Sequence, residues 1–307
     1  MPEIITNPSN LSKCWMDAAK NDPYNNSGSD YSVTSINQPP QQKQLMERHD
    51  YAVDVRSKVW SILGTAVHEV LERMGGAEQG VITEQRLFMT IETADGRKFK
   101  FSGAVDRCEK LSDGTYHIKD FKITKVFAVS HGVKDDWQMQ LNIYRMLAET
   151  NLKVSVNKLS IEAMLKDWSE RDYMQSRHSD RDYPSAEIHI VDVPLLTREE
   201  VMEHIMERIE LHESAKFLPD TELPECTDAE RWCTNSGYRL NKLGVNRALP
   251  KCSKIATAAD AEEIRQTRKD KDNVEVTFVR GVSKRCERFC PVKQFCNQYQ
   301  TKINPKF

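Results

Sequence analysis

The spacing of apolar and polar residues along the chain predicts long helices interleaved with several strands. Apolar side chains recur every three or four positions over residues 57–73, which is typical of a helix with one buried face. Asp95-Gly96 and Asp113-Gly114 favour tight hairpin turns, because glycine adopts positive φ at little cost. Thr197 is placed to cap the last predicted helix. The expected helices span residues 57–73, 135–149 and 198–215, and the expected strands span residues 83–93, 98–110, 115–124, 158–166 and 187–193, which predicts an α/β fold.

Local composition divides the chain into three parts. Residues 1–50 are rich in Asn, Ser, Pro and Gln, which favours an irregular N-terminal arm with one short helix near residues 10–21. Residues 51–218 carry the predicted helices and strands and are expected to form the core. Residues 219–307 hold six of the eight cysteines, which predicts a cysteine-rich C-terminal lobe packed on the core. The sequence contains no internal repeat.

The overall composition is that of a folded protein with little net charge. The 307 residues are 39% hydrophobic, which is enough for a sizeable core and argues against general disorder. The formal net charge of -2 neither indicates nor excludes a nucleic-acid partner. There is no apolar run of about 18 residues, and the first residues lack the features of a secretory signal. We therefore expect no membrane association and a cytoplasmic location, where cysteines serve as thiols or metal ligands.

Four ionisable residues stand on three consecutive predicted elements. His68 lies on the apolar side of the first helix, Asp106 lies on the second strand, and Asp120 and Lys122 lie on the third. Because side chains alternate across a strand, Asp120 and Lys122 share one face. The second and third strands are hairpin partners, so Asp106 and Asp120 come close and repel each other unless a cation lies between them. Mg²⁺ or Mn²⁺ is the expected cation, and His68 is an additional ligand that suits Mn²⁺.

Further residues extend this candidate metal site, and each of its members also has a simpler interpretation. Lys122 beside a metal can orient water and stabilise charge on a phosphate, and the backbone carbonyl of Phe121 could complete the metal shell. Glu72 is either a further acidic contributor or a solvated helix residue. Alternatively, Asp-x-Lys can face solvent, His68 can be a hydrogen-bonded core histidine, and Asp106 can cap a turn. The order of these residues on a helix followed by a hairpin favours a hydrolytic site.

The same residues form a longer pattern. It consists of Gly-x3-His at residues 64–68, Gly-x2-Asp at 103–106, Asp-x-Lys at 120–122 and Gln-x3-Tyr at 140–144. This pattern resembles the RecB-type branch of the PD-(D/E)xK nuclease superfamily, although many members of the superfamily have Glu at the position of Asp120. The resemblance implies a restriction-endonuclease-like core, a central mixed sheet flanked by helices. The implied roles are metal ligation for His68, Asp106 and Asp120, catalysis for Lys122, and support of the site for Gln140 and Tyr144.

Other segments are similar to members of this superfamily that phages and prophages encode. They are DPY at residues 22–24, SVT at 32–34, PP at 39–40 and CTDAERW at 226–232. The resemblance implies a metal-dependent DNA nuclease, most simply an exonuclease, that acts on ends or single strands in phage replication, recombination or repair. It is compatible with an oligomer or a recombination-protein partner and with the host cytoplasm. The alternatives are a catalytically inactive DNA-binding or assembly protein with the same fold, and an iron–sulfur redox protein.

The cysteines near the C-terminus form a second candidate centre. The C-x3-C-x5-C run at residues 286–296 has a spacing that suits a soft metal. Several RecB-type nucleases hold a [4Fe–4S] cluster with one distant cysteine and a closing C-x2-C-x5-C run, so the resemblance implies such a cluster here despite the longer first gap. Cys226 is the first choice for the fourth ligand, ahead of Cys14 and Cys233. Zn²⁺ and reduced buried thiols remain alternatives. The expected ligand set is Cys226, Cys286, Cys290 and Cys296.

Contacts with DNA are predicted from basic and aromatic residues around the site. Lys122, Lys125, Arg145 and the basic stretch 265–288 are candidate phosphate contacts. Trp137 could stack on an unpaired base. Alternatively, Trp137 packs in the core. The basic stretch also contains acidic residues, so it can instead be a solvated surface.

Overall fold

The computed structural model describes residues 3–21, 27–75, 80–130, 132–179 and 182–304. The DPY segment at 22–24 lies outside these residues. The chain divides into two compact units. We call them the sheet unit, which holds the chain up to Gln38 and Ala52–Phe217, and the cysteine unit, which holds Pro39–Tyr51 and the chain from Leu218 onward. The segment expected to form an N-terminal arm is therefore divided between the two units.

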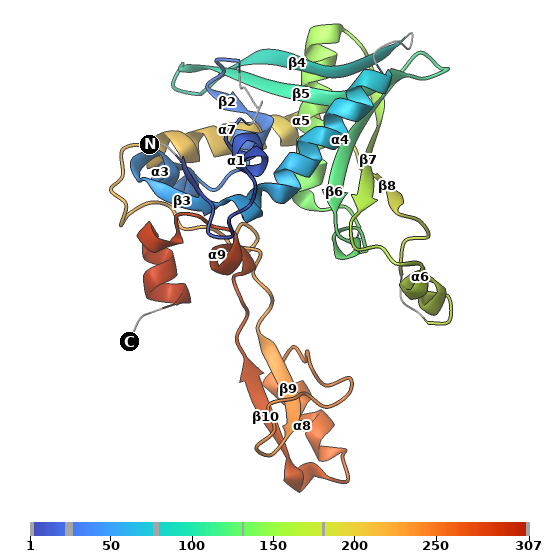
Figure 1. Cartoon of the computed structure of the whole chain (residues 1–307), viewed down its shortest axis with the longest axis vertical. Coiled ribbons are helices and arrows are strands. Elements are labelled where there is room, and N and C mark those ends of the chain that lie inside the picture. Colours follow the sequence, from blue (N-terminus) through green and yellow to red (C-terminus); the bar gives the residue numbers. More distant parts are fainter. Residues whose placement is uncertain (1–2, 22–26, 76–79, 131, 180–181, 305–307) are drawn as a thin grey trace. The chain divides into compact units, whose positions relative to one another are not determined.

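Among the described residues, the sheet unit contains a mixed sheet of six strands (Figure 1). These are β2 (Tyr31–Ser32), β4 (Val81–Glu92), β5 (Lys98–Lys110), β6 (Tyr116–Thr124), β7 (Val156–Leu165) and β8 (Ile188–Asp192). The order is β2-β5-β6-β7-β8, and β4 also pairs with β5. The β4–β5, β5–β6 and β7–β8 pairs are antiparallel, whereas β6 and β7 run parallel. The predicted α/β class with a central mixed sheet is confirmed.

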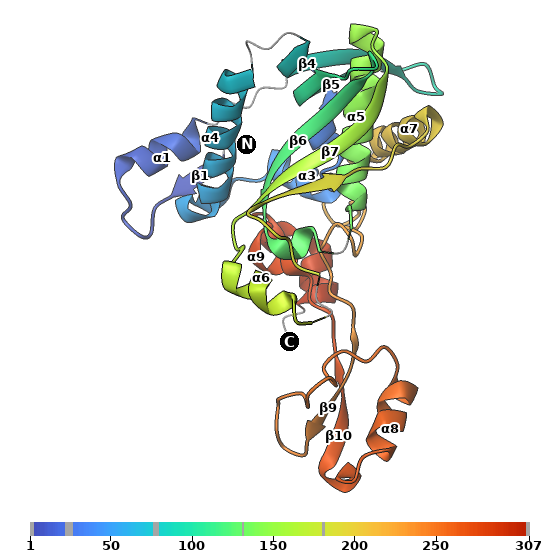
Figure 2. The same cartoon turned by 90° about the vertical axis from the view of Figure 1, so that its right-hand side faces the viewer.

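Helices cover both faces of this sheet. The described helices of the sheet unit are α1 (Lys13–Lys20), α2 (Val33–Ile36), α4 (Val59–Gly75), α5 (Asp135–Leu152), α6 (Glu170–Ser176), which lies beyond the ends of the strands (Figure 1), and α7 (Arg198–Ala215). Figure 2 shows α1 and α4 on one side of the sheet and α5 and α7 on the other. Thr197 caps α7 as predicted, because its hydroxyl accepts from the Glu200 N–H while the Glu200 carboxylate accepts from the Thr197 N–H. Outside the sheet, β1 (Glu3–Thr6) pairs with β3 (Tyr51–Asp54), and short 3₁₀ turns span Val55–Lys58 and Val126–Ala128.

The two long helices that contact β6, α4 and α5, differ strongly in how much of their surface is buried. Leu141 and Leu147 of α5 are fully buried, and they belong to the same core as Ile118 of β6 and Ile161 of β7. In contrast, none of the described side chains of α4 is buried, although the helix is rich in apolar residues such as Trp60. The core therefore fixes α5 firmly, whereas α4 keeps much of its surface available to solvent.

The sequence pattern does not predict several of the described helices, and two of these, α3 (Pro40–Arg48) and α6, lie in polar segments. The first lies in the cysteine unit and starts with proline at its first turn, where the missing N–H costs nothing. Its Gln41 and Gln44 are buried, so residues that favour an irregular arm in the sequence lie inside a helix that packs. The second is α6, whose N-terminus is capped by the Ser169 hydroxyl.

The remainder of the cysteine unit is a small hairpin module followed by short turns. The strands β9 (Gly237–Lys242) and β10 (Val274–Val279) pair antiparallel, and α8 (Ala258–Gln266) packs against both. A 3₁₀ turn at Lys271–Asn273 precedes β10, and after that strand the chain forms α9 (Lys284–Arg288), a 3₁₀ turn at Lys293–Phe295 and a π turn at Tyr299–Ile303. The module has its own core of Leu240, Cys252, Ile255, Ala261 and Val274. In the described part of the chain, no helix combines the length and the apolar character needed to span a membrane.

Candidate active site

The candidate site lies where β5 and β6 separate. Their ladder ends at the pair Arg107 and Lys119, so Asp106 and Asp120 are the next residues along the two strands and stand opposite each other. Oδ2 of Asp106 accepts a hydrogen bond from the backbone N–H of Phe121 at 2.9 Å. Burial, followed by the negative charge of Asp120, raises the pKa of Asp106 to about 7. The two carboxylates are therefore close enough to interact, as the hairpin pattern predicts.

His68 reaches this point from α4. Its Nε2 lies 3.1 Å from the carbonyl oxygen of Phe121, and its Nδ1 lies 3.2 Å from Oε1 of Glu84 and 3.6 Å from Oδ2 of Asp106. The hydrogen bond with Glu84 is the main cause that raises the pKa of His68 to about 9; burial opposes the shift and Asp106 adds to it. The carboxylates around His68 thus favour positive charge at this point of the site.

Glu84 is a member of this site that the sequence pattern does not reveal. Ligand atoms of His68, Glu84 and Asp106 all lie within 4.8 Å of one another, which is compatible with a shared metal ion. Glu84 has a φ of 46°, a left-handed conformation that non-glycine residues rarely adopt and that often marks functional sites. The register of the β4–β5 hairpin, extended to Glu84, would have predicted its position in the site. Glu92 pairs with Lys98, so Glu84, eight residues before Glu92, falls opposite Asp106, eight residues after Lys98.

Asp120 faces a different set of partners. Its Oδ2 lies 2.7 Å from Nζ of Lys122, which confirms that the two side chains share one face of β6. Lys122 also donates to Oε1 of Gln140 at 3.1 Å, and Nε2 of Gln140 donates to the hydroxyl of Tyr144 at 3.1 Å. Burial lowers the pKa of Lys122, but the charge and hydrogen bond of Asp120 together with the charges of Asp106 and Asp136 outweigh it, so the pKa is raised and the ammonium form is favoured. Asp120 does not belong to the group of three ligand atoms around His68.

The structure thus gathers the sequence-predicted catalytic residues into two adjoining sets. One set offers a histidine nitrogen and carboxylate oxygens, with the carbonyl oxygen of Phe121 alongside, and this is a donor set that suits Mn²⁺ or Mg²⁺. The other set is the ion pair of Asp120 and Lys122, held in place by the amide of Gln140. Such a site can bind a divalent ion and present an ammonium group beside it.

The two motif glycines near the site have different surroundings. A Cβ at Gly103 would lie 2.7 Å from Val33 Cγ2, 2.8 Å from Leu147 Cδ1 and 2.9 Å from Tyr144 Cε1. Glycine at this position therefore lets α5, which carries Tyr144, lie against β5. A Cβ at Gly64, in contrast, would have nothing within 4 Å.

These surroundings predict opposite effects of two identical substitutions. We expect Gly103→Ala to lower the free energy of unfolding by about 1–3 kcal/mol, because the core is overpacked. Gly64→Ala is expected to raise it by about 0.5–1 kcal/mol, because alanine favours a helix interior. Urea denaturation of both variants measures the difference. An equal loss of stability in the two would contradict the packing role of Gly103.

The residues predicted to contact DNA differ in availability. Lys125 is exposed just after β6. Arg145 is engaged, since it pairs with Glu149 at 3.1 Å and donates to the carbonyl of Leu196 at 3.1 Å, and Trp137 is buried. In the cysteine unit, part of the basic stretch is neutralised by the ion pairs of Arg265 with Glu262 and of Arg268 with Asp270.

Four cysteines gather inside the cysteine unit. Burial, then Glu230, then the thiols of Cys296, Cys286 and Cys290 raise the pKa of Cys226 to about 12, so all four thiols lie within electrostatic reach of one another. The Cys296 and Cys226 thiols also share an acceptor, Oε1 of Gln41, at 3.3 Å and 3.6 Å. No three of these sulfurs lie within 4.8 Å of one another among the residues described.

The two other candidates for the fourth ligand are placed differently. Cys14 is exposed in the sheet unit, where its sulfur lies 3.0 Å from the Ser12 hydroxyl. Cys233 belongs to the cysteine unit, where its thiol donates to the carbonyl of Thr234. Within the cysteine unit, Cys226 interacts electrostatically with all three thiols of the closing run.

Comparison with known proteins extends over the whole candidate site. A family model described as the PD-(D/E)XK nuclease superfamily matches residues 35–297, a span that contains every residue of the two adjoining sets and all four gathered cysteines. A search of curated proteins gives no match. A solved structure described as the crystal structure of SSO0001 is 16% identical, with 66% of this chain and 86% of that chain covered and a TM-score of 0.43. A similarity this low supports no conclusion about the site.

Proposed function

This chain belongs to the PD-(D/E)XK nuclease superfamily, and on that basis we propose that it is a divalent-metal-dependent DNA nuclease of the RecB-type branch. The observation that supports this most directly is the pairing of a possible metal group, His68, Glu84 and Asp106, with the buried Asp120–Lys122 ion pair. Phage-type replication, recombination or repair is the proposed setting, because the chain resembles phage-encoded members in several segments.

The residues around His68 fit a divalent cation. Two carboxylates and an imidazole meet with the carbonyl of Phe121, and hard oxygen donors together with one nitrogen suit Mn²⁺ and accept Mg²⁺. Burial and then the charge of Asp120 raise the pKa of Asp106, and the hydrogen bond with Glu84 raises the pKa of His68, so a cation bound among these carboxylates would offset their mutual repulsion. When bound, such an ion supplies Lewis acidity and lowers the pKa of a coordinated water.

The chain's own residues would do the rest of the work on the phosphate. The Lys122 ammonium group, kept charged by Asp120, is available to stabilise the extra negative charge of the pentavalent phosphate. Gln140 accepts a hydrogen bond from the Lys122 ammonium group, and the Tyr144 hydroxyl accepts one from the Gln140 amide. The ammonium group is therefore held by a chain of hydrogen bonds from α5. The complete set favours an active enzyme over an inactive DNA-binding descendant, which would have no chemical need for all of these groups.

Digestion of end-labelled linear DNA and circular DNA of the same sequence tests the proposal. We expect the linear substrate to be degraded with Mn²⁺ or Mg²⁺, the circular substrate to resist, and EDTA to stop the reaction. Cleavage of circular DNA would replace the exonuclease assignment by an endonuclease. Activity that persists in EDTA, or no activity on any DNA with either metal, would remove the proposed function.

We also propose that Cys226, Cys286, Cys290 and Cys296 hold a [4Fe–4S] cluster. The four thiols are gathered and partly or fully buried, which suits a soft metal centre. Zinc is the alternative, because four thiolates are also a common structural zinc site. The cluster would fix α3 and the closing segment within the cysteine unit through the residues around Gln41.

Absorbance and metal content of anaerobically purified protein measure this directly. We expect a broad visible band and stoichiometric iron, both lost in Cys290→Ser and retained in Cys14→Ser, whose thiol is exposed elsewhere. Because the cluster would staple the unit, its loss is expected to lower the thermal midpoint of unfolding. A colourless protein that contains zinc, or no metal at all, would refute the cluster.

A further inference from the structure

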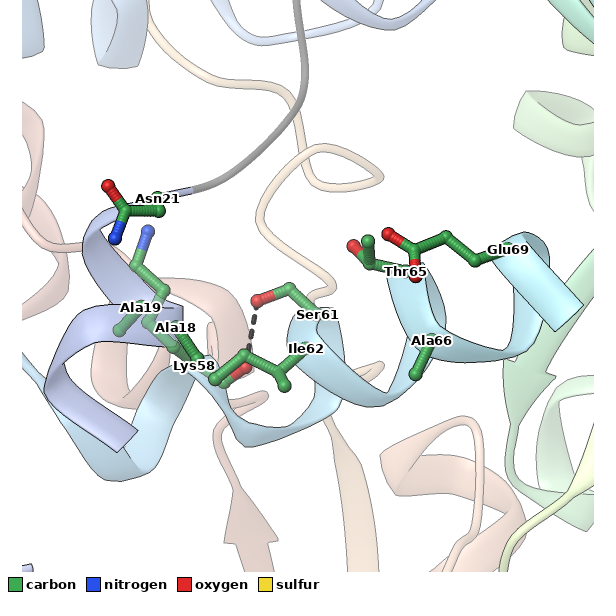
Figure 3. Close-up of a pocket in the computed structure, with 9 residues that line it drawn as sticks. All are labelled: Ala18, Ala19, Asn21, Lys58, Ser61, Ile62, Thr65, Ala66 and Glu69. Atoms are coloured by element: carbon green, nitrogen blue, oxygen red, sulfur yellow. Dashed lines mark hydrogen bonds between the residues drawn. The ribbon is translucent and has the colours of Figure 1, made fainter. Parts of the chain in front are cut away.

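One side of α4 connects the candidate metal site with an exposed tryptophan. Trp60, Gly64 and His68 recur every four residues, so they lie along one side of the helix. Trp60 is 51% exposed, and the helical rise places it about 12 Å from His68 along the axis. The other side of α4, with Ser61, Thr65 and Glu69, lines a pocket against α1 and takes no part in this row (Figure 3).

Lysine covers one face of this tryptophan. Nζ of Lys166 lies 3.6 Å from the centroid of the Trp60 ring. Lys166 directly follows β7, and its backbone N–H donates to the carbonyl of Thr124, the last residue of β6. Trp60 therefore stands at the end of the same strand whose Phe121 carbonyl contacts His68. The side of α4 that carries the row runs along β6, from the metal site to the end of the strand.

A second lysine lies at the same strand end. Lys125 is exposed, and Lys122 lies only three residues before it on β6. Burial, followed by the charge of Lys125, lowers the pKa of Lys166, whereas Asp167 opposes the shift. Two ammonium groups are thus close enough to repel each other beside a half-exposed indole. Phosphate groups bound there would relieve this repulsion.

Between Trp60 and His68, this side of α4 carries no side chain, because position 64 is glycine. A glycine inside a helix costs about 0.5–1 kcal/mol relative to alanine. The packing of the protein does not require glycine at position 64, because a Cβ there would have nothing within 4 Å. The space left above Gly64 is therefore open to a group from outside the chain, and a strand that passes from Trp60 to His68 would cross it.

We propose that Trp60, Lys166 and Lys125 form a subsite for single-stranded DNA that leads the substrate strand over Gly64 into the metal site. An unpaired base stacks on Trp60, and the two lysines bind the adjoining phosphates. The subsite deepens the proposed nuclease function and rests on it. It selects single strands because the faces of bases in a duplex are already stacked on their neighbours and cannot reach an exposed ring.

Anisotropy of a labelled single-stranded oligonucleotide, measured in EDTA so that no cleavage occurs, tests the subsite. We expect Trp60→Ala to weaken binding by roughly 5- to 150-fold, the range of one base–aromatic stack. Trp60→Phe should keep most of the affinity. Trp15→Ala, at a partly exposed tryptophan of α1, serves as the matched control and should change nothing. Lys166→Gln should flatten the salt dependence, lowering the slope of log K against log salt by about 0.7.

The same variants on blunt duplex DNA separate the alternatives. We expect duplex affinity to be almost insensitive to Trp60→Ala, and an equal loss on duplex would overturn stacking on an unpaired base. Unchanged single-strand affinity in a folded Trp60→Ala variant would also overturn the subsite, and a changed oligomeric state instead would assign the surface to contacts between copies of the chain. Cleavage by the wild type with Mn²⁺ is scored separately. If the wild type cleaves DNA but its binding does not depend on Trp60, only the subsite proposal is refuted. If the wild type neither binds nor cleaves DNA, the proposed nuclease function is refuted as well.

Discussion

Lys122→Met is expected to reduce DNA cleavage by about 10²–10³-fold or more, with little change in DNA binding. Methionine keeps the length and apolar stem of lysine but removes the ammonium group that Asp120 and Gln140 hold in the site. Loss of one preorganised group that stabilises transition-state charge typically costs this much in kcat. Initial rates on end-labelled DNA at saturating Mn²⁺ give the ratio.

A lysine on the same strand provides the control. Lys119 pairs with Glu109 at 2.8 Å and with Glu162 at 3.5 Å, outside the candidate site, so Lys119→Met should retain activity. Because Lys122→Met leaves the buried Asp120 carboxylate without its cation, thermal unfolding of the variant must be recorded as well. The double variant Lys122→Met with Asp120→Asn removes both charges of the ion pair. A folded Lys122→Met protein with normal turnover would refute the catalytic role of Lys122.

Glu84→Gln is expected to weaken Mn²⁺ binding at least tenfold. Glu84 offers one of three ligand atoms that lie together, and even partners outside the first coordination shell typically contribute about 10–100-fold in metal affinity. Glutamine keeps the shape and removes the charge. Calorimetric titration of the metal measures the loss, and Glu72→Gln, at an exposed position of α4, is the matched control that should bind as the wild type does.

The same substitution changes a proton equilibrium in the metal-free protein. The hydrogen bond with Glu84 is the main reason that the pKa of His68 is raised to about 9, so Glu84→Gln should lower this pKa towards the usual value for histidine. In the wild type the imidazole is protonated below this pKa, and a metal must displace the proton. Mn²⁺ affinity is therefore expected to rise as pH approaches 9 and to fall at lower pH. Unchanged affinity and an unchanged His68 titration in Glu84→Gln would exclude Glu84 from the site.

Much of the sheet unit could be predicted because its patterns are local. Helical spacing predicts α4, alternation and turn glycines predict the β4–β5–β6 hairpins, and a capping threonine marks the start of α7. Asp120 and Lys122 lie on one face because alternation along a strand leaves no other arrangement. The prediction of an irregular arm was wrong for α3. There, buried glutamines make a polar segment part of a packed helix.

Sequence alone predicted four of the side chains proposed for the site, His68, Asp106, Asp120 and Lys122, because helix and strand periodicity sets the faces on which they lie. Only the tertiary structure decided which of these side chains contact one another. Register across the β4–β5 hairpin puts Glu84 beside His68, and the separation of β5 from β6 leaves Asp120 to pair with Lys122. The physical reason is that periodicity fixes the direction of a side chain within its own element. Partners on other elements depend on register and on where a ladder ends, which distant contacts set.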